Sequence, residues 1–166
     1  MNNYEILQTG ESARPPTQCP VNPSKRILVV DDDISVRVLS AEVLISLGYH
    51  VDIAADGAAG WEALHANSYD LLITDNNMPK VSGIELVKRL RSARMTLPVV
   101  LASGSVPTEE LSRNPSLQLA ATLLKPFSPD ELLGTVKQVL CATEGAHSRT
   151  ETYFPVMTAT APRPKI

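Results

Sequence analysis

The sequence is poor in the features that mark several protein classes. It has 2 cysteines in 166 residues, too few for a disulfide framework, which favours a reducing cytoplasm. No apolar run reaches the ~18–20 residues that a membrane-spanning helix needs. The first residues also lack the basic start and the apolar stretch of a secretory signal. We therefore expect a cytoplasmic chain without a membrane partner.

Positive charge does not dominate either. The chain has 15 Lys and Arg against 18 Asp and Glu, for a net charge of -3. Nucleic-acid binding depends on clustered positive charge, so we expect no nucleic acid among the partners. Hydrophobic residues still make up 43% of the chain, which is typical of a folded globular protein.

Composition divides the chain into three parts. Residues 1–24 hold four prolines and little apolar periodicity, and residues 142–166 hold five threonines and three prolines. Neither segment can bury enough apolar surface to offset the entropy of ordering it, so we expect disordered tails at both ends. The stretch 25–141 has the length of one domain and contains no internal repeat.

Within this domain, short apolar runs alternate with helical patterns. The runs predict five strands, at residues 27–30, 50–54, 71–73, 98–102 and 122–124. Strands that alternate with helices favour an α/β fold with a doubly wound parallel sheet, covered by helices on both faces. Between the fourth and fifth strands, Pro107 and Pro115 confine any helix to one or two turns, because proline is tolerated only near a helix start.

Polar residues stand at the ends of four predicted strands. Asp31 and Asp32 follow the first strand, Asp75 the third, Ser103 the fourth and Lys125 the fifth. In a parallel sheet these ends share one edge, which is where ligands bind. Clustered carboxylates repel one another unless a cation is present, and their hard oxygens suit Mg²⁺. The edge is predicted to be a phosphoryl-transfer site, without any Walker-type or GxGxxG nucleotide cradle.

Four segments together resemble the receiver domains of two-component response regulators. They are ILVVDDD at 27–33, DLLITDNNMPKVSG at 70–83, LPVVLASG at 97–104 and LLKPF at 123–127. They stand in the family's order and at its spacings, and the resemblance covers residues 25–141. It implies the flavodoxin-like, CheY-like (βα)5 fold, here with a short or irregular fourth helix. The LASG segment resembles the corresponding segment in receivers of hybrid sensor kinases.

The resemblance implies a role for each residue at the edge. Asp75 would be the phospho-acceptor, Lys125 its counter-charge, and Ser103 the hydroxyl that turns toward the phosphoryl group. The Lys125–Pro126 bond would be cis. A Mg²⁺ site would use three side chains, with Asp31 binding directly or through water, and one backbone carbonyl: Asp31, Asp32, Asp75 and Asn77.

The function implied is that of a single-domain response regulator in a two-component system or phosphorelay. Asp75 would take a phosphoryl group from a phosphohistidine on a histidine kinase or a histidine phosphotransfer protein, with Mg²⁺ as the cofactor. The phosphoprotein would then signal through contacts with a downstream protein target. It would not be an enzyme in the usual sense, since self-phosphorylation and autodephosphorylation are the only reactions expected.

Two alternatives stay open. A receiver-like scaffold would bind partners independently of phosphorylation. It is favoured by Thr122, where the family often has an aromatic ring, and by Gln118, where it usually has glycine. A Mg²⁺-dependent aspartyl phosphohydrolase is the other alternative. Such enzymes carry DxDx[TV] after their first strand, whereas here DDD is followed by Ile34 and Ser35.

Other residues receive structural interpretations. Asp33 is expected to be solvated or to cap the following helix, and Trp61 is expected in the core. A basic run on and after the third predicted helix is interpreted as a solvated face: Lys88, Arg89, Arg91 and Arg94.

Overall fold

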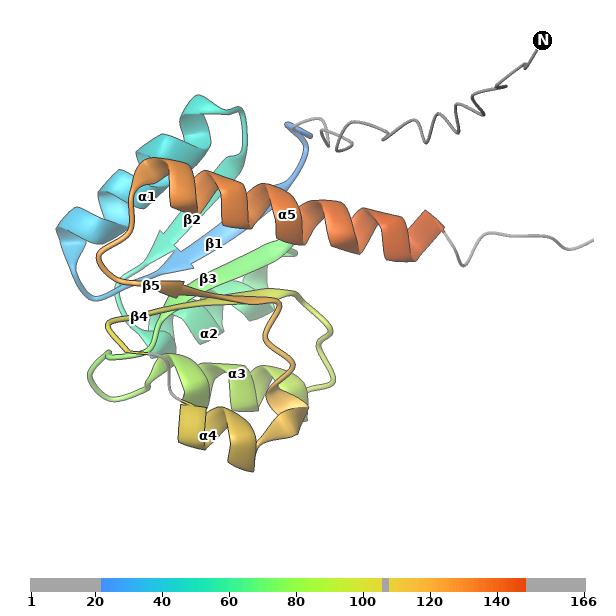
Figure 1. Cartoon of the computed structure of the whole chain (residues 1–166). Coiled ribbons are helices and arrows are strands. Elements are labelled where there is room, and N and C mark those ends of the chain that lie inside the picture. Colours follow the sequence, from blue (N-terminus) through green and yellow to red (C-terminus); the bar gives the residue numbers. More distant parts are fainter. Residues whose placement is uncertain (1–21, 106–107, 149–166) are drawn as a thin grey trace, which may run out of the picture.

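The computed structural model describes residues 22–105 and 108–148. Over these residues strands and helices alternate along the chain (Figure 1). The elements, with their bounds, are β1 (Arg26–Val30), α1 (Ile34–Ser46), β2 (His50–Ala54), α2 (Gly57–Ala66), β3 (Leu71–Asp75), α3 (Gly83–Ser92), β4 (Val99–Ser103), α4 (Thr108–Arg113), the 3-10 helix η1 (Pro115–Leu117), β5 (Ala121–Leu124) and α5 (Pro129–Ser148). None of the described helices is both long and apolar enough to span a bilayer.

The five strands form one parallel sheet in the order β2-β1-β3-β4-β5. Helices α1 and α5 lie on one face, and α2, α3 and α4 lie on the other (Figure 1). This confirms the predicted doubly wound, flavodoxin-like fold. The order places β1 beside β3, so the carboxyl ends of both strands meet at one edge.

The core consists of two apolar layers, one on each face of the sheet. Along β1, Leu28 and Val30 belong to the layer under α2 and α3, whereas Ile27 and Val29 belong to the layer under α1 and α5. This alternation follows from the two-residue period of a strand. All residues of β3 and β4 are buried, as central strands of a sheet covered on both faces must be.

Local capping explains where two helices begin and where one ends. The Asp33 carboxylate accepts hydrogen bonds from the first turn of α1, which confirms the predicted cap. Gly48, just after α1, has a φ of +92°, a left-handed conformation that glycine adopts without steric cost. At α5, the Ser128 hydroxyl accepts from the Glu131 N–H, and the Glu131 carboxylate accepts from the Ser128 N–H. These reciprocal bonds form a capping box.

The fourth helix is short, as expected. Helix α4 has 6 residues, none of them buried, and the chain continues through η1, in which Leu117 is buried. Pro115 is the first residue of η1, a position that needs no backbone donor.

Arg91 does not belong to a solvated face, and the prediction for this residue was wrong. Its guanidinium donates to four carbonyl oxygens: those of Met95 (2.8 Å), Leu97 (3.0 Å), Leu117 (2.9 Å) and Gln118 (3.1 Å). Burial lowers the pKa of Arg91. The side chain ties the α3–β4 connection to the segment that leads into β5.

At the carboxyl end, the described chain extends beyond the predicted domain boundary. Helix α5 continues to Ser148 and projects beyond the sheet (Figure 1), so residues 142–148 are helical. In this extension, Glu144 pairs with Lys25 (3.6 Å) and accepts a hydrogen bond from Asn22 (3.3 Å). The remainder of the predicted tails, 1–21 and 149–166, lies outside the described residues.

Cys141 lies in α5, at the predicted end of the folded stretch. The other cysteine of the sequence, Cys19, lies outside the described residues.

Candidate functional site

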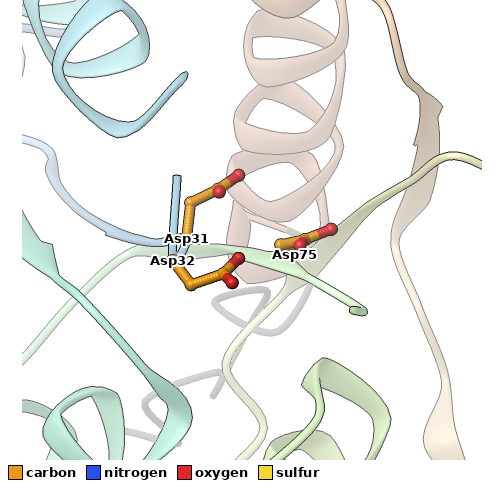
Figure 2. Close-up of side chains that lie close together, drawn as sticks. All are labelled: Asp31, Asp32 and Asp75. Carbon is orange, nitrogen blue, oxygen red and sulfur yellow. The ribbon is translucent and has the colours of Figure 1, made fainter. Parts of the chain in front are cut away.

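Three carboxylates lie together at the carboxyl edge of the sheet. Asp31 and Asp32 follow β1, and Asp75 is the last residue of β3; Figure 2 shows the three side chains close together. Each offers an oxygen that lies within 4.8 Å of those of the other two. Asp31 and Asp75 are buried, at 3% and 5% exposed, while Asp32 is open to solvent. Carboxylate oxygens in this arrangement fit a hard divalent cation such as Mg²⁺.

Lys125, which directly follows β5, bridges two of these carboxylates. Its Nζ lies 2.7 Å from Asp31 Oδ2 and 3.2 Å from Asp75 Oδ1. Burial lowers the pKa of Lys125, but its hydrogen bond to Asp31 and the charges of Asp31 and Asp75 outweigh that effect and raise it. The predicted convergence of the lysine with the acidic cluster is present in the structure. The peptide bond between Lys125 and Pro126 is cis, as expected.

Asp31 is held at all of its polar atoms. Its Oδ1 accepts from the Asp33 N–H (3.0 Å) and its Oδ2 from Lys125, while its own N–H donates to the carbonyl of Ala54 (3.2 Å) and its carbonyl accepts from Arg37. Burial raises the pKa of Asp31, and the hydrogen bonds from Lys125 and from the Asp33 N–H oppose the rise without cancelling it. Both carboxylate oxygens of Asp31 are therefore already engaged.

Asp32 and Asp75 have freer carboxylates. The Asp32 side chain makes no hydrogen bond or ion pair with any described residue, and for Asp75 the only such contact within the described chain is the one from Lys125 to Oδ1. These two residues thus keep oxygens available for a cation or an incoming group.

The loop after Asp75 is fixed by the neighbouring elements. The Asn76 N–H donates to the carbonyl of Ala102 (3.0 Å), and the Asn76 carbonyl accepts from the Gly83 N–H (3.3 Å). A Cβ on Gly83 would lie 2.2 Å from the carbonyl oxygen of Asp75, so glycine is required where α3 meets the end of β3. Asn77, the predicted carbonyl ligand, is exposed on this loop, two residues after Asp75.

Ser103 ends β4 beside β3. It is buried, and its carbonyl accepts from the Lys125 N–H at 2.8 Å. Its hydroxyl accepts from the Ser105 N–H at 3.4 Å. Ser103 and Asn77 thus lie at the same edge as the carboxylates. Within the described chain, neither side chain forms a hydrogen bond with those carboxylates. Among the residues around the site, Arg37 and Asn76 had not been singled out from the sequence.

A wide hollow of about 1170 Å³ lies elsewhere on the molecule. Its lining includes Lys25, Tyr69, Asp70, Arg94 and Glu144, and it contains none of the acidic cluster. These residues stand near the amino ends of the strands, so the hollow is separate from the site described above.

Comparison with known proteins identifies the class. CheY4 of Vibrio cholerae, a chemotaxis protein, is 31% identical, with a TM-score of 0.66 over 70% of this chain and 98% of that chain. The response regulator TrrA of Thermotoga maritima, solved in complex with Mg²⁺-BeF, is 31% identical, with a TM-score of 0.62 over 69% of this chain and 98% of that chain. The doubly wound sheet with its acidic edge is thus a CheY-like fold.

The family model for the response regulator receiver domain matches residues 27–137. The chain belongs to this family. It is also 34% identical over 137 residues to the sensor protein EvgS of Escherichia coli O157:H7, covering 81% of this chain and 11% of that protein. The chain spans about half the length of the transcriptional regulatory proteins that it matches. Receiver domains are signalling modules of two-component systems, and these matches favour neither the scaffold nor the phosphohydrolase.

Proposed function

We propose that Asp75 accepts a phosphoryl group from a phosphohistidine. The observation that carries this proposal is the placement of Lys125, whose ammonium contacts Asp75 while the other carboxylates crowd the same edge. A buried carboxylate with one engaged and one available oxygen is suited to act as a nucleophile. Asp31, whose two oxygens are both engaged, is not.

The donor set for Mg²⁺ consists of three side chains and one carbonyl: Asp31, Asp32, Asp75 and Asn77. Asp32 and Asp75 offer free oxygens, so direct ligation falls to them, and Asp31 acts directly only if Lys125 leaves its Oδ2. When bound, the ion supplies positive charge against the phosphoryl oxygens. The similarity of this chain to TrrA, which was solved in complex with Mg²⁺-BeF, supports this assignment.

The reaction is a displacement at phosphorus. An Asp75 carboxylate oxygen forms the new P–O bond while the P–N bond to the donor imidazole breaks, and the electron pair of that bond stays on the ring nitrogen. Lys125 attracts the phosphoryl oxygens as charge spreads over them. Ser103 then turns its hydroxyl toward the new phosphoryl group, which biases the end of β4 and the α4 segment.

A histidine kinase or a histidine phosphotransfer protein is the proposed donor. Exposed apolar side chains lie on the elements that adjoin the acidic edge: Ile34 opens α1 at 65% exposed, Leu39 in α1 is 54% exposed, and Leu124 beside Lys125 is 57% exposed. Exposed apolar side chains next to a polar site favour a protein docking surface. We propose that the donor docks there, that a downstream protein takes the signal, and that the chain acts in the cytoplasm, where ATP-driven kinases work.

Phosphorylation with a small-molecule donor tests the proposal. Incubation with acetyl phosphate and Mg²⁺ is expected to add one phosphoryl group, seen by intact-mass spectrometry, and Asp75→Asn is expected to prevent it. Phosphorylation that survives in Asp75→Asn would contradict the assignment. A wild-type chain that stays unmodified with small donors and with phosphorylated histidine kinases would favour the scaffold.

A further inference from the structure

Arg37 carries a positive charge at a position where helices disfavour one. It lies in the first turn of α1, with its N–H bonded to the Asp33 carbonyl at 3.0 Å. The helix dipole makes this end of a helix partly positive, so acidic residues are favoured there and basic ones are not. Such a departure from a local rule needs a compensating contact.

The compensating contact is to the backbone of the acidic cluster. The half-buried Arg37 guanidinium donates through Nη1 to the carbonyl oxygen of Asp31. It forms no ion pair with a carboxylate among the described residues, although three carboxylates stand at the adjacent strand ends. The arginine thus holds a peptide group rather than a side chain.

That peptide group is the link between two of the predicted metal ligands. The Asp31 carbonyl and the Asp32 N–H belong to one planar unit, so fixing the oxygen also fixes the orientation in which the chain enters Asp32. The Asp32 side chain itself makes no hydrogen bond or ion pair within the described structure. Its direction therefore depends on the backbone on which it stands.

We propose that Arg37 is a positioning residue for Asp32 as a Mg²⁺ ligand. By anchoring the Asp31–Asp32 peptide, it holds the exposed Asp32 carboxylate beside Asp75, in the geometry that the ion requires. The proposal rests on the proposed function of the acidic edge. It adds a residue that orients a ligand without binding the ion itself. Groups that orient a ligand commonly control metal affinity.

Calorimetric titration of the full chain with Mg²⁺ tests this role. Arg37→Met keeps the packing of the alkyl stem and removes the donors, and it is expected to weaken Mg²⁺ binding roughly tenfold. The phosphorylation rate at saturating Mg²⁺ is expected to stay at the wild-type value, because only ion binding is affected. Arg37→Lys, which can still donate to one carbonyl, is expected to restore most of the affinity. Arg89→Met on α3, an exposed arginine, serves as the control.

Three results decide the matter. Equal Mg²⁺ affinity of wild type and a folded Arg37→Met would overturn the assignment. So would a slower phosphorylation at saturating Mg²⁺ with unchanged affinity, since that would place Arg37 in the reaction itself. A wild-type chain that binds no Mg²⁺ would overturn the proposed function as well. Circular dichroism verifies folding, and if Arg37→Met does not fold, Arg37→Leu, which also lacks a donor, takes its place with the same expected weakening.

Discussion

At the scale of single residues, Asp32 differs from the other members of the acidic cluster. Its side chain is exposed and makes no hydrogen bond or ion pair with the described residues. In the absence of an ion, its charge therefore repels Asp31 and Asp75 with no attractive contact to offset the repulsion. Asp32→Asn is therefore expected to raise the free energy of unfolding in metal-free buffer. The same change removes a ligand, so stabilisation by Mg²⁺ should disappear.

Urea unfolding with and without Mg²⁺ measures both effects. At an ion concentration ten times the dissociation constant, linkage gives the wild type about 1.4 kcal/mol of added stability, and Asp32→Asn should gain none. Asp33→Asn is the matched control, because it removes a charge from the same turn while an asparagine can still cap α1. Mg²⁺ stabilisation that persists in Asp32→Asn would show that this residue does not bind the ion.

Lys125 makes the stability of the fold depend on pH in the alkaline range. Although burial lowers its pKa, the hydrogen bond to Asp31 and the nearby carboxylates raise the pKa of the folded state above its ordinary value of 10.5. The unfolded state therefore loses this proton first as the pH rises. The stabilisation is complete below pH 10.5 and is lost as the pH rises through the folded value.

Comparison of wild type with Lys125→Met isolates this contribution. The difference between their free energies of unfolding is expected to stay constant below about pH 10 and to shrink above it. Urea unfolding at a series of alkaline pH values gives the difference directly. A difference that stays constant throughout would mean that the ammonium does not stabilise the cluster.

Gly83 has no room for a side chain. A Cβ there would lie 2.2 Å from the Asp75 carbonyl oxygen, which belongs to backbone and cannot move aside cheaply. Gly83→Ala is expected to cost about 2–3 kcal/mol of stability and to slow phosphorylation by shifting Asp75. Gly134 in α5 has nothing within 4 Å, so Gly134→Ala should instead stabilise by about 0.5–1 kcal/mol. Equal effects of the two changes in urea unfolding would contradict this explanation.

At the scale of elements, Arg91 compensates for the shortness of α4. Helix α4 buries no residue, and the following segment is held by Leu117 and by the bonds from Arg91 to the Leu117 and Gln118 carbonyls. Arg91→Met would leave partly buried carbonyls without donors, at a cost of about 3 kcal/mol. Hydrogen exchange should accelerate in η1 and at the start of β5, while Arg89→Met should leave it unchanged. Unchanged exchange in Arg91→Met would show that other contacts hold the segment.

The elements themselves could largely be predicted from the sequence, because their signals are local. Apolar runs mark the strands, and Asp33 and Ser128 mark helix starts by accepting from nearby backbone N–H groups. Pro115 marks the start of η1 through its fixed φ. The folded stretch was predicted to end at residue 141, since residues 142–148 have no apolar stripe, whereas α5 continues to Ser148. The contacts of Glu144 in this extension are with Lys25 and Asn22, more than a hundred residues away, and no local pattern reports them.

The position of Arg91 could not be predicted for a related reason. It stands in a basic run on α3, and nothing in that run distinguishes the arginine that turns inward from those that stay in solvent. The carbonyls that it binds come from the α3–β4 connection and from η1. Only the packing of these two segments brings them together.

At the scale of the whole molecule, strand order assembles the site. Because β1 lies between β2 and β3, residues more than forty positions apart become neighbours at one edge. The meeting of Asp31, Asp32, Asp75 and Lys125 could therefore be predicted once a parallel sheet was inferred. The individual contacts within the site could not be predicted, because they depend on exact distances. Lys125 lies closer to Asp31 than to Asp75, and Arg37 binds the carbonyl of the peptide between Asp31 and Asp32.

The central claim is that one carboxylate among three, Asp75, carries the phosphoryl group. Borohydride reduction converts a phosphorylated aspartate into homoserine, so the modified position can be found by peptide mass spectrometry after treatment with Mg²⁺ and acetyl phosphate. We predict homoserine at residue 75 alone, and none when the phosphodonor is left out. Homoserine at residue 31 or 32 instead, or in no peptide of a chain that has gained a phosphoryl group, would contradict the account.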